Sequence, residues 1–586
     1  MNHPKSSTSR ASAYLLADHF DLLIVAVICL LGNSMFGSAG GRRGLELMPW
    51  PDGLEYAAAA MNLAKGREAV LHFGGYTYPS RYTGGYPLIL EFFGGVFGAE
   101  YEAFHVSMIV GMLAIVAVYM LARGLFGRLA ATIAALLLAL SPVFITYSTL
   151  VMSDVPTLFV TVLAAAMLML ATSEYASKRQ GMRLAAWLLF GLAAGFSAIV
   201  RPTNTTILVG LAVCVVIVPL ENRDFASLLK AGLAVAIGFA IPVTWQLHQN
   251  AINLGSAFAS GYTWWVPEVY GEGGKTFSLA YLFGPTMPRN PYGNVIVYVT
   301  TLLGLDGFIG NRASPGYFLY PFAAAAFAIV GLIAILSVPG RPAMRRLTWF
   351  GLGYLGALTG LYCFYIFTDV AFILPGAFIG FVAAGCGVVS CNQYVRDVIR
   401  NRNRKSYKLV SAASVIVLDV LLVVSLATEA VARLSVQPQS SEMVESLESL
   451  DSTLPRDATV VSNISLLFLD LYLGEERNYA GLNSMDPGER FTDYHLHRLY
   501  EKRANGWSGP VPPVVFDGGR MEQSETDAIA SAIAGNKPVY LLVAAPESQQ
   551  YADVLKDEMG EMGAKFGVEP VSENEAIAVY RFSGKQ

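Results

Sequence analysis

The sequence predicts a polytopic α-helical membrane protein with a small soluble α/β domain at its C-terminal end. Of its 586 residues, 54% are apolar and only 14% are charged, whereas soluble domains have about 25% charged residues. Apolar runs of about 20 residues, long enough to cross a hydrocarbon core, recur through residues 1–435. Residues 436–586 contain no such run and have a net charge of −12, against +8 for residues 1–435. This composition excludes a disordered chain, a disulfide-rich secreted scaffold and a soluble multidomain enzyme.

About eleven candidate membrane spans follow one another along the chain. Residues 1–17 are polar and lack a signal-peptide pattern, so we expect the first span to be a retained anchor. The spans are predicted from apolar runs of helical length. They are residues 19–38, 103–122, 129–148, 155–172, 184–200, 204–220, 231–248, 317–338, 347–367, 371–391 and 409–430.

Basic residues gather in every second connection between these spans, for example at Arg123 and Arg128 and again between Arg396 and Lys408. Basic loops favour the cytoplasmic side of a membrane, so we expect these loops and the N-terminus in the cytoplasm. The loops 39–102 and 249–316 and the domain 436–586 are then external. We therefore predict a membrane domain over residues 1–435 in a plasma (inner) membrane and a periplasmic or extracellular domain over 436–586.

The acidic C-terminal region shows the pattern of an α/β domain. Short β-rich runs at 458–463, 512–516, 538–544 and 576–582 alternate with helical stretches at 525–534 and 549–562. Its negative charge argues against nucleic acid as a partner. All five cysteines lie in or beside apolar runs of the membrane domain, so the sequence contains neither a disulfide framework nor a cysteine-based zinc site.

The first external loop contains two unusual polar segments. Asp52 follows Pro51, and we expect it to cap a helix over residues 53–65 that includes Glu55. Residues 76–87 are rich in Tyr, Gly and Pro, which favours a rigid aromatic wall that includes Tyr82. Arg81 is the single charge in this segment and could bind a phosphate through two N–H groups. The alternative is an ordinary interfacial belt of Tyr and Arg.

Further polar residues are expected at the same outer face. Asp154 begins the fourth span, Arg201 with Pro202 separates the fifth from the sixth, and Asp369 lies between the ninth and the tenth. The loop 249–316 adds Trp264 and Trp265, which suit contacts with sugar rings or lipid chains. Each of these residues alone is typical of a helix cap or an interfacial anchor. Three acids and two arginines on one side together predict a functional site.

These motifs resemble the GT-C class of membrane glycosyltransferases, near glycosyltransferase family 39, which includes protein O-mannosyltransferases and lipid A aminoarabinose transferases. The resemblance runs through most of residues 20–391 and implies a GT-C-like membrane domain. Two positions depart from the relatives' pattern: Gly53 follows Asp52 where a second acid is common, and Ala371 stands where Arg is common. The matching segments are Pro51-Asp52-Gly53-Leu54-Glu55-Tyr56, Tyr78-Pro79-Ser80-Arg81-Tyr82, Gly85-Tyr86-Pro87, Met152-Ser153-Asp154-Val155-Pro156, Arg201-Pro202 and Asp369 before Phe372-Ile373-Leu374-Pro375.

The resemblance implies an inverting transfer of a monosaccharide from a polyprenyl-phosphate donor to a hydroxyl acceptor on a glycan, lipid or protein, at the outer face of the membrane. Asp52 is then the expected general base, and Arg81 and Arg201 bind the donor phosphate. Asp154 is the second expected catalytic residue, which could orient the surroundings of Asp52, bind acceptor hydroxyls or hold a divalent ion. The other expected substrate-binding residues are Glu55, Tyr82, Trp264, Trp265 and Asp369. No cofactor is expected; a divalent ion between Asp52 and Asp154 is an alternative that the sequence does not require.

Two other classes of function compete with an enzyme. A transporter or lipid flippase would place ionisable groups inside the bilayer, and Asp419 lies in the middle of an apolar run. A non-catalytic assembly scaffold would keep the fold and make the outer polar residues dispensable. We favour the enzyme because five of the charged candidates lie at the outer rim and only one lies within a span.

Overall fold

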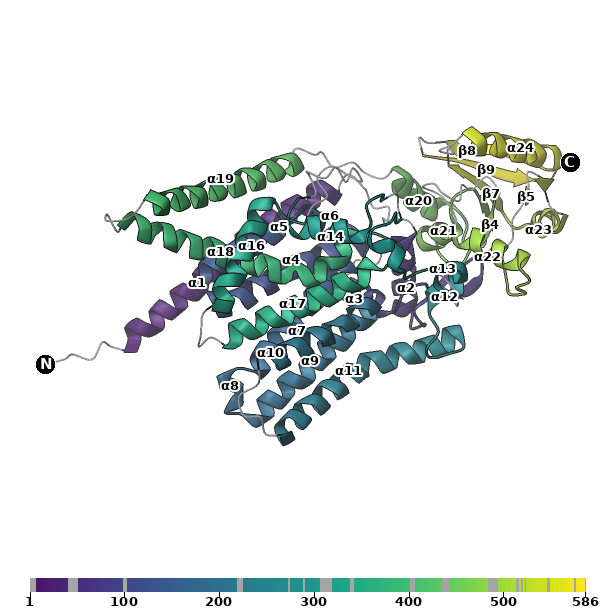
Figure 1. Cartoon of the computed structure of the whole chain (residues 1–586). Helices are drawn as coiled ribbons and strands as arrows, with labels where there is room; N and C mark the ends of the chain where they lie inside the picture. Colours follow the sequence, from purple (N-terminus) through teal and green to yellow (C-terminus); the bar gives the residue numbers. More distant parts are fainter. Residues whose placement is uncertain are drawn as a thin grey trace.

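A computed structural model of the chain describes sixteen segments (Figure 1). They are residues 7–40, 51–97, 103–218, 225–271, 275–287, 290–305, 319–337, 342–400, 406–434, 442–482, 494–512, 516–517, 520–521, 523–544, 549–573 and 576–584. The expected domain boundary at 435/436 lies outside these residues.

The N-terminal three quarters of the chain form a helical body. Its long helices are packed side by side, and α1 leaves the body at the end opposite to the C-terminal sheet (Figure 1). The helices are α1 (Ser7–Gly40), α4 (Ala103–Phe126), α5 (Arg128–Ala139), α6 (Pro142–Ser148), α7 (Asp154–Ala171), α8 (Glu174–Ser177), α9 (Gln180–Val200), η1 (Pro202–Thr206), α10 (Ile207–Ile217), α11 (Phe225–Leu254), α16 (Phe322–Ser337), α17 (Pro342–Cys363), η3 (Val370–Ile373), α18 (Leu374–Arg400) and α19 (Ser406–Leu434).

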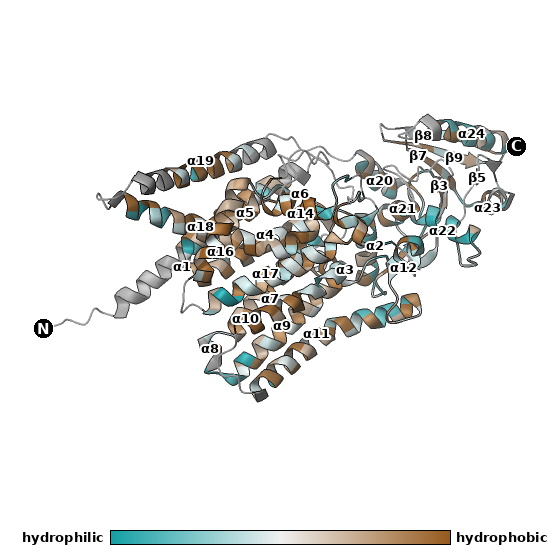
Figure 2. Ribbon diagram, viewed as in Figure 1, coloured by the Kyte–Doolittle hydropathy of each residue, from teal (hydrophilic) through white to brown (hydrophobic). Residues whose placement is uncertain are grey.

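The described helices agree with the predicted class of polytopic membrane protein. Five of them are long and apolar enough to cross a membrane, and α5 with α6 forms a sixth candidate that is bent by 63°. Four shorter apolar helices, at Phe20–Phe36, Pro202–Ile217, Phe322–Ser337 and Ala413–Thr428, coincide with further predicted spans. The count of eleven spans therefore stays a prediction. Hydrophobic residues, in brown, predominate along these helices (Figure 2), and large apolar side chains such as Leu229, Leu233 and Ile237 of α11 are exposed, as expected where lipid is the solvent.

Small residues let the helices of the body approach closely. A Cβ atom at Gly331 of α16 would lie 1.9 Å from the carbonyl oxygen of Ala383 in α18. A Cβ atom at Gly191 of α9 would similarly lie 2.2 Å from the carbonyl oxygen of Val235 in α11. Close backbone packing of this kind is the main source of helix association in membranes, where lipid removes the hydrophobic drive between helices.

One end of the body is built from short elements of residues 39–102 and 249–316, the two loops that the sequence predicts to be external. The first loop forms α2 (Asp52–Ala64), the antiparallel hairpin β1 (Val70–Phe73) with β2 (Tyr76–Pro79), and α3 (Gly85–Phe97). The second loop forms α12 (Gly261–Trp265), α13 (Pro267–Tyr270), η2 (Leu279–Leu282) and α14 (Asn294–Leu302).

The C-terminal residues form a five-stranded mixed sheet with the order β4-β3-β7-β9-β8 and flanking helices. Strand β3 runs parallel to β4 and β7, with Val461 opposite Leu541, whereas β9 is antiparallel to both β7 and β8. The elements are α20 (Glu442–Thr453), β3 (Thr459–Ser462), α21 (Leu466–Leu473), β4 (Asn478–Gly481), α22 (Tyr494–Ala504), β5 (Phe516–Asp517), β6 (Arg520–Met521), α23 (Gln523–Ala534), β7 (Val539–Ala544), α24 (Gln549–Lys565), β8 (Gly567–Glu573) and β9 (Ile577–Ser583).

The first external loop and the C-terminal region share one hydrophobic core. Leu54 of α2 and Phe73 of β1 are buried in the same cluster as Leu466 and Leu469 of α21 and Leu499 of α22. Burial of apolar side chains on both sides of this junction fixes the C-terminal sheet against this end of the helical body.

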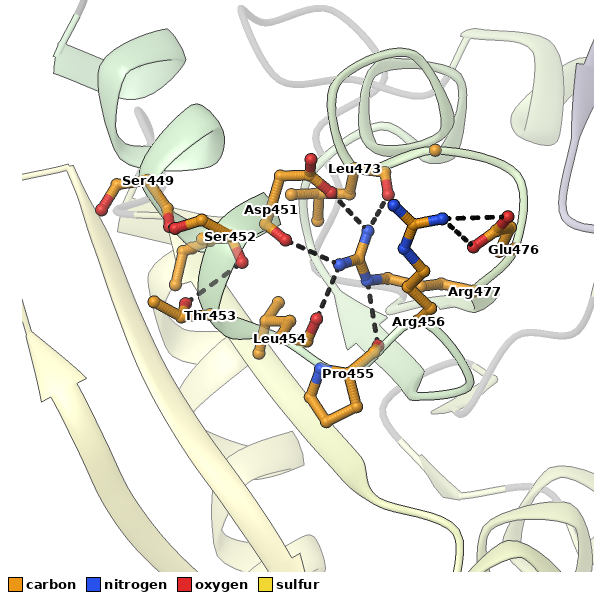
Figure 3. Close-up of polar contacts among 12 residues, drawn as sticks. Ser449, Asp451, Ser452, Thr453, Leu454, Pro455, Arg456, Leu473, Glu476 and Arg477 are labelled. Atoms are coloured by element: carbon orange, nitrogen blue, oxygen red, sulfur yellow. Dashed lines mark hydrogen bonds and ion pairs between the residues drawn. The ribbon is translucent and has the colours of Figure 1, made fainter.

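A buried arginine holds the turn that docks onto α2. Figure 3 shows Arg477 donating to the carbonyl oxygens of Leu473, Leu454 and Pro455 and to the Asp451 carboxylate, the last at 2.7 Å. The same turn carries Glu475, whose carboxylate pairs with Lys65 and Arg67 just after α2, at 2.7 Å each. Burial raises the pKa of Glu475, but the two cations outweigh it and lower this pKa to about 2.

Candidate functional site

Five segments far apart in the sequence meet at the end of the body that carries the C-terminal sheet. They are the start of α2, the segment after β2, the starts of α7 and η3, and the turn between α9 and η1. Tyr56 of α2 joins them: its hydroxyl donates to Ser153 Oγ at 3.3 Å, and it interacts electrostatically with Asp52, Asp154 and Arg201. Burial raises the pKa of the Tyr56 hydroxyl above its ordinary value, so it stays a proton donor.

Asp52 and Glu55 lie one turn apart on α2 and both bind Arg81. Arg81 Nη2 donates to Asp52 Oδ1 at 2.9 Å, and its Nε donates to Glu55 Oε1. The backbone N–H of Arg81 and the Ser80 hydroxyl donate to Glu55 Oε2 at 3.0 and 3.2 Å. Burial raises the pKa of Glu55, but Arg81 and His495 outweigh it and lower this pKa to about 2. Glu55 is therefore ionised at neutral pH and orients Arg81.

Asp154 and Arg201 form a second pair. Asp154 is the first residue of α7 and is fully buried, and its Oδ1 accepts from Arg201 Nη1. Arg201 directly follows α9 as its C-terminal capping residue and Pro202 begins η1, so the two residues separate the helices as predicted. The Nε group of Arg201 donates to the Tyr362 hydroxyl at 3.0 Å, and its guanidinium lies 4.6 Å from the ring centroid of Phe372.

The expected capping roles of Asp52 and Asp154 are wrong. The capping positions are occupied by Pro51 and Ser153, and each aspartate is itself the first helical residue. The physical reason is the arginine opposite each carboxylate, since a charge-assisted bond to guanidinium is stronger than a bond to a backbone N–H. Asp369 does cap a helix: its Oδ1 accepts from the N–H of Ala371 at 2.8 Å at the start of η3.

Asp369 also joins the second pair. Its Oδ2 accepts from the Tyr147 hydroxyl of α6, and its charge acts on Asp154. The structure thus brings together Asp52, Glu55, Arg81, Asp154, Arg201 and Asp369, all of which the sequence assigned to the outer face.

The aromatic residues divide into two groups. Tyr82 stacks on Tyr56 with ring centroids 4.3 Å apart and meets Tyr262 edge-on at 5.5 Å, so it belongs to the wall beside Asp52. Trp265 is 1% exposed, and its indole N–H donates to the Pro79 carbonyl at 2.6 Å. The Lys502 ammonium lies over the Trp264 ring, with Nζ 4.4 Å from the ring centroid. Trp264 thus contacts the C-terminal region, and Trp265 packs between Pro79 and the ring of His495, whose centroid is 4.9 Å away. These contacts favour a packing role over sugar binding.

Exposure separates the three carboxylates nearest the arginines. The Asp52 side chain is 28% exposed, whereas those of Glu55 and Asp154 are 0% exposed. A group that exchanges a proton with a substrate must come within hydrogen-bond reach of it. Of the three, Asp52 is the carboxylate open to an approaching ligand, and the two buried acids are suited to orienting the arginines.

Sequence reasoning missed four contributors to this site: Tyr56, Tyr147, Tyr362 and His495. Tyr56 lies within the Pro51–Tyr56 segment and could have been found from its position one helical turn beyond Asp52. The other three had no local signal, because Tyr147 and Tyr362 lie within apolar helices and His495 lies in the C-terminal region, where no motif was found.

One group of described residues has metal-ligand chemistry. Ligand atoms of His72, Asp470 and Glu475 lie within 4.8 Å of one another at the junction of β1 with α21. His72 Nδ1 lies 3.3 Å from Asp470 Oδ2, and Lys65 and Arg67 already neutralise Glu475. We assign this group to docking of the C-terminal region. Burial raises the pKa of Asp470 above its ordinary value.

The family described as dolichyl-phosphate-mannose-protein mannosyltransferase matches residues 85–247, just over a quarter of the chain. That range contains Asp154 and Arg201. Comparison with curated protein sequences gives no match.

Solved structures of three proteins share the fold of nearly the whole chain. ArnT from Cupriavidus metallidurans, bound to undecaprenyl phosphate, matches with a TM-score of 0.59 and 14% identity over 97% of this chain and 100% of its own. The oligosaccharyltransferase AglB from Archaeoglobus fulgidus, in complex with an inhibitory peptide and a dolichol-phosphate, matches with a TM-score of 0.51 and 13% identity over 97% and 75%. The arabinofuranosyltransferase AftD from Mycobacteria matches with a TM-score of 0.50 and 16% identity over 97% and 40%. The resemblance to GT-C glycosyltransferases indicated by the sequence motifs is thus confirmed at the level of fold.

Proposed function

We propose that this chain is a membrane glycosyltransferase that moves a monosaccharide from a polyprenyl-phosphate donor to a hydroxyl acceptor, with inversion, at the outer face of a plasma (inner) membrane. One observation carries the proposal. Asp52 is a partly exposed carboxylate beside two arginine–carboxylate pairs at one end of a GT-C-like helical body. The lipid phosphates bound by ArnT and AglB support the choice of donor class.

In the proposed reaction Asp52 accepts the proton of the acceptor hydroxyl as its oxygen attacks the anomeric carbon. The new bond joins this oxygen to the anomeric carbon, and the bond from that carbon to the phosphate oxygen breaks. The phosphate leaves with the electron pair as polyprenyl phosphate, so its charge grows from −1 to −2. A single displacement of this kind inverts the anomeric centre.

Arginine is suited to stabilising the growing phosphate charge. Arg201 uses Nε and Nη1 for Tyr362 and Asp154, and among the described residues its Nη2 group has no hydrogen-bond partner, so this group is the proposed phosphate donor. Arg81 is bound by Asp52 and Glu55, so its first effect is on the orientation of Asp52. The Tyr56–Tyr82–Tyr262 wall would pack against the sugar.

The transporter alternative has less support. Asp419 of α19, the one charge expected within a span, interacts with Asn392 of α18. This interaction gives Asp419 a helix-packing role and leaves the outer rim as the main concentration of charge.

The variant Asp52→Asn tests the proposal in purified full-length protein. Undecaprenyl-phosphate sugars carrying mannose, glucose, arabinose or N-acetylglucosamine would be supplied with envelope extract as acceptor, and release of undecaprenyl phosphate would be measured by mass spectrometry. Wild type should turn over at least one donor. Asp52→Asn should be about 100-fold slower or more, because the base is lost while the shape is kept.

Asp457→Asn, at an exposed acid of the C-terminal region, is the matched control and should retain wild-type turnover. If Asp52→Asn keeps more than about a tenth of that turnover, the base lies elsewhere, and Asp154 is the next candidate. Inactivity of the wild type on every donor would contradict the proposed function itself.

A further inference from the structure

A histidine from the C-terminal region reaches the site on α2. His495 of α22 is 1% exposed, and its Nε2 lies 2.9 Å from Glu55 Oε1. Its ring is enclosed by Trp265 and Phe73, with centroids 4.9 and 5.8 Å away. A histidine so deeply buried, with Nε2 beside a buried carboxylate, points to a role beyond surface solubility.

Three contacts connect this histidine to the proposed base. His495 contacts Glu55, Glu55 binds Arg81 through Nε and the backbone N–H, and Arg81 Nη2 donates to Asp52 at 2.9 Å. Glu55 thus has neighbours on both carboxylate oxygens, so its rotamer is fixed from several sides. The rotamer of Glu55 fixes the orientation of the Arg81 guanidinium. The guanidinium in turn fixes the orientation of the Asp52 carboxylate through the Nη2 hydrogen bond.

The position of His495 depends in turn on how α22 is docked. Arg498 pairs with Glu268 of α13 at 2.5 Å, and the Lys502 ammonium donates to the carbonyl oxygen of Trp264 in α12. These contacts hold α22 against the second external loop. The membrane body and the C-terminal region thus both contribute side chains to the surroundings of Asp52.

We infer that His495 is a positioning residue for sugar transfer: the C-terminal region completes the site by fixing Glu55, and through Arg81 it orients Asp52. The inference rests on the proposed function and extends it to a part of the chain for which the sequence indicated no activity. Loss of the contact leaves Glu55 Oε1 held by Arg81 Nε alone, so Glu55, Arg81 and with them Asp52 sample orientations in which Asp52 does not meet the acceptor hydroxyl.

The experiment compares four variants of the full-length protein in the undecaprenyl-phosphate sugar assay. His495→Leu removes the polar edge, and His495→Gln retains an N–H donor at similar reach. His497→Leu and His497→Gln are matched controls two residues along the same helix, where the side chain is 51% exposed. We expect His495→Leu to lower kcat about 10-fold with the donor KM changed less than about threefold, because misplacement of a reacting group acts on the chemical step. His495→Gln should recover most of kcat, and both controls should match wild type.

A charge exchange at the docking contact gives a second test if His495→Leu fails to fold. Glu268→Arg and Arg498→Glu should each lower kcat through repulsion at α22, and the double exchange should restore it. The inference is overturned if folded His495→Leu has wild-type kcat, if His495→Gln is no better than His495→Leu, or if the docking variants leave kcat unchanged. If the wild type is active in those cases, the proposed function holds and only the role of His495 is contradicted. An inactive wild type would contradict both the proposed function and the role of His495.

Discussion

At the scale of single residues, Arg201 has two candidate partners, a buried carboxylate and a lipid phosphate. Its Nη1 binds Asp154, and its Nε binds Tyr362. Removing the whole side chain would leave Asp154 buried and unpaired, which destabilises proteins by about 3–5 kcal/mol. Arg201→Ala would therefore confuse folding with phosphate binding.

Arg201→Lys separates the two roles, because Lys keeps the charge for Asp154 but lacks the planar fork. We expect kcat/KM for the lipid donor to fall about 10- to 100-fold, with a thermal unfolding temperature near that of wild type. Arg456→Lys, at an exposed arginine paired with Glu476, is the control and should change neither value. Wild-type kcat/KM in Arg201→Lys would restrict Arg201 to holding Asp154.

The ionisation of Glu55 predicts how the stability of the protein depends on pH. Its pKa is lowered from 4.5 to about 2 in the folded protein, so its ionised form contributes stability above the unfolded pKa, and this contribution is lost as the pH falls through the folded pKa. At pH 7 the free energy of unfolding of Glu55→Gln should be about 3 kcal/mol lower than that of wild type. Glu55→Gln should therefore unfold at a lower temperature. The difference in unfolding temperature between Glu55→Gln and wild type should persist down to about pH 5 and become smaller between pH 4.5 and 2.

Thermal unfolding in detergent across this pH range measures the effect. Glu445→Gln, at an exposed acid of α20, serves as the control and should track wild type throughout. A difference between Glu55→Gln and wild type that already disappears at pH 6 would show that Glu55 titrates near that pH and that its pKa is not lowered.

At the scale of elements, α12 packs directly on the segment that carries Arg81. A Cβ atom at Gly261 would lie 1.9 Å from the carbonyl oxygen of Ser80 and 2.8 Å from Arg81 Cα. Gly261→Ala should therefore displace Arg81, and kcat should fall about 10- to 100-fold, as expected for a shift of about 1 Å at a site of this kind.

Gly232→Ala is the matched control, since a Cβ at this position in α11 meets no atom within 4 Å, and its kcat should equal that of wild type. Both variants should be recovered from membranes in wild-type amounts. Wild-type kcat in Gly261→Ala would show that α12 yields without moving Arg81.

The elements also show where sequence reasoning succeeds and where it stops. The start of α2 and the Arg201–Pro202 junction depend on local residues, and both could be predicted. Strands β4 (Asn478–Gly481) and β8 (Gly567–Glu573) were missed. They are the two edge strands of the sheet, where half of the backbone is unpaired and polar, Gly and Pro residues are tolerated, so the alternation typical of a strand is weak.

The same limit applies to the site. The sequence placed Asp52, Arg81, Asp154, Arg201 and Asp369 on one face because each follows or precedes a span. Their pairing could not be predicted, since Asp52 meets Arg81 across 29 residues and Asp154 meets Arg201 across 47. The contact of His495 with Glu55 depends on docking of the whole C-terminal region. Local sequence patterns do not predict how that region docks.

At the scale of the whole molecule, the basic loops and the position of α1 agree with one orientation of the protein in the membrane. The basic loops predict a cytoplasmic N-terminus, and α1 leaves the body at the end opposite to the C-terminal sheet (Figure 1). The candidate site lies at the end that carries the sheet. An external C-terminal region would thus place Asp52 on the side where an extracytoplasmic acceptor is found.

Cysteine labelling in cells tests this orientation. The five native cysteines, all in the membrane domain, would first be replaced by serine or alanine, and single cysteines introduced at Ser452 of α20 and Ser177 of α8. An impermeant maleimide should label Ser452→Cys in intact cells, with the outer membrane permeabilised where one exists, and should label Ser177→Cys only after lysis. Labelling of Ser177→Cys and protection of Ser452→Cys in intact cells would reverse the topology. Asp52, Arg81 and Arg201 would then face the cytoplasm, where they could not act in the proposed transfer at the outer face.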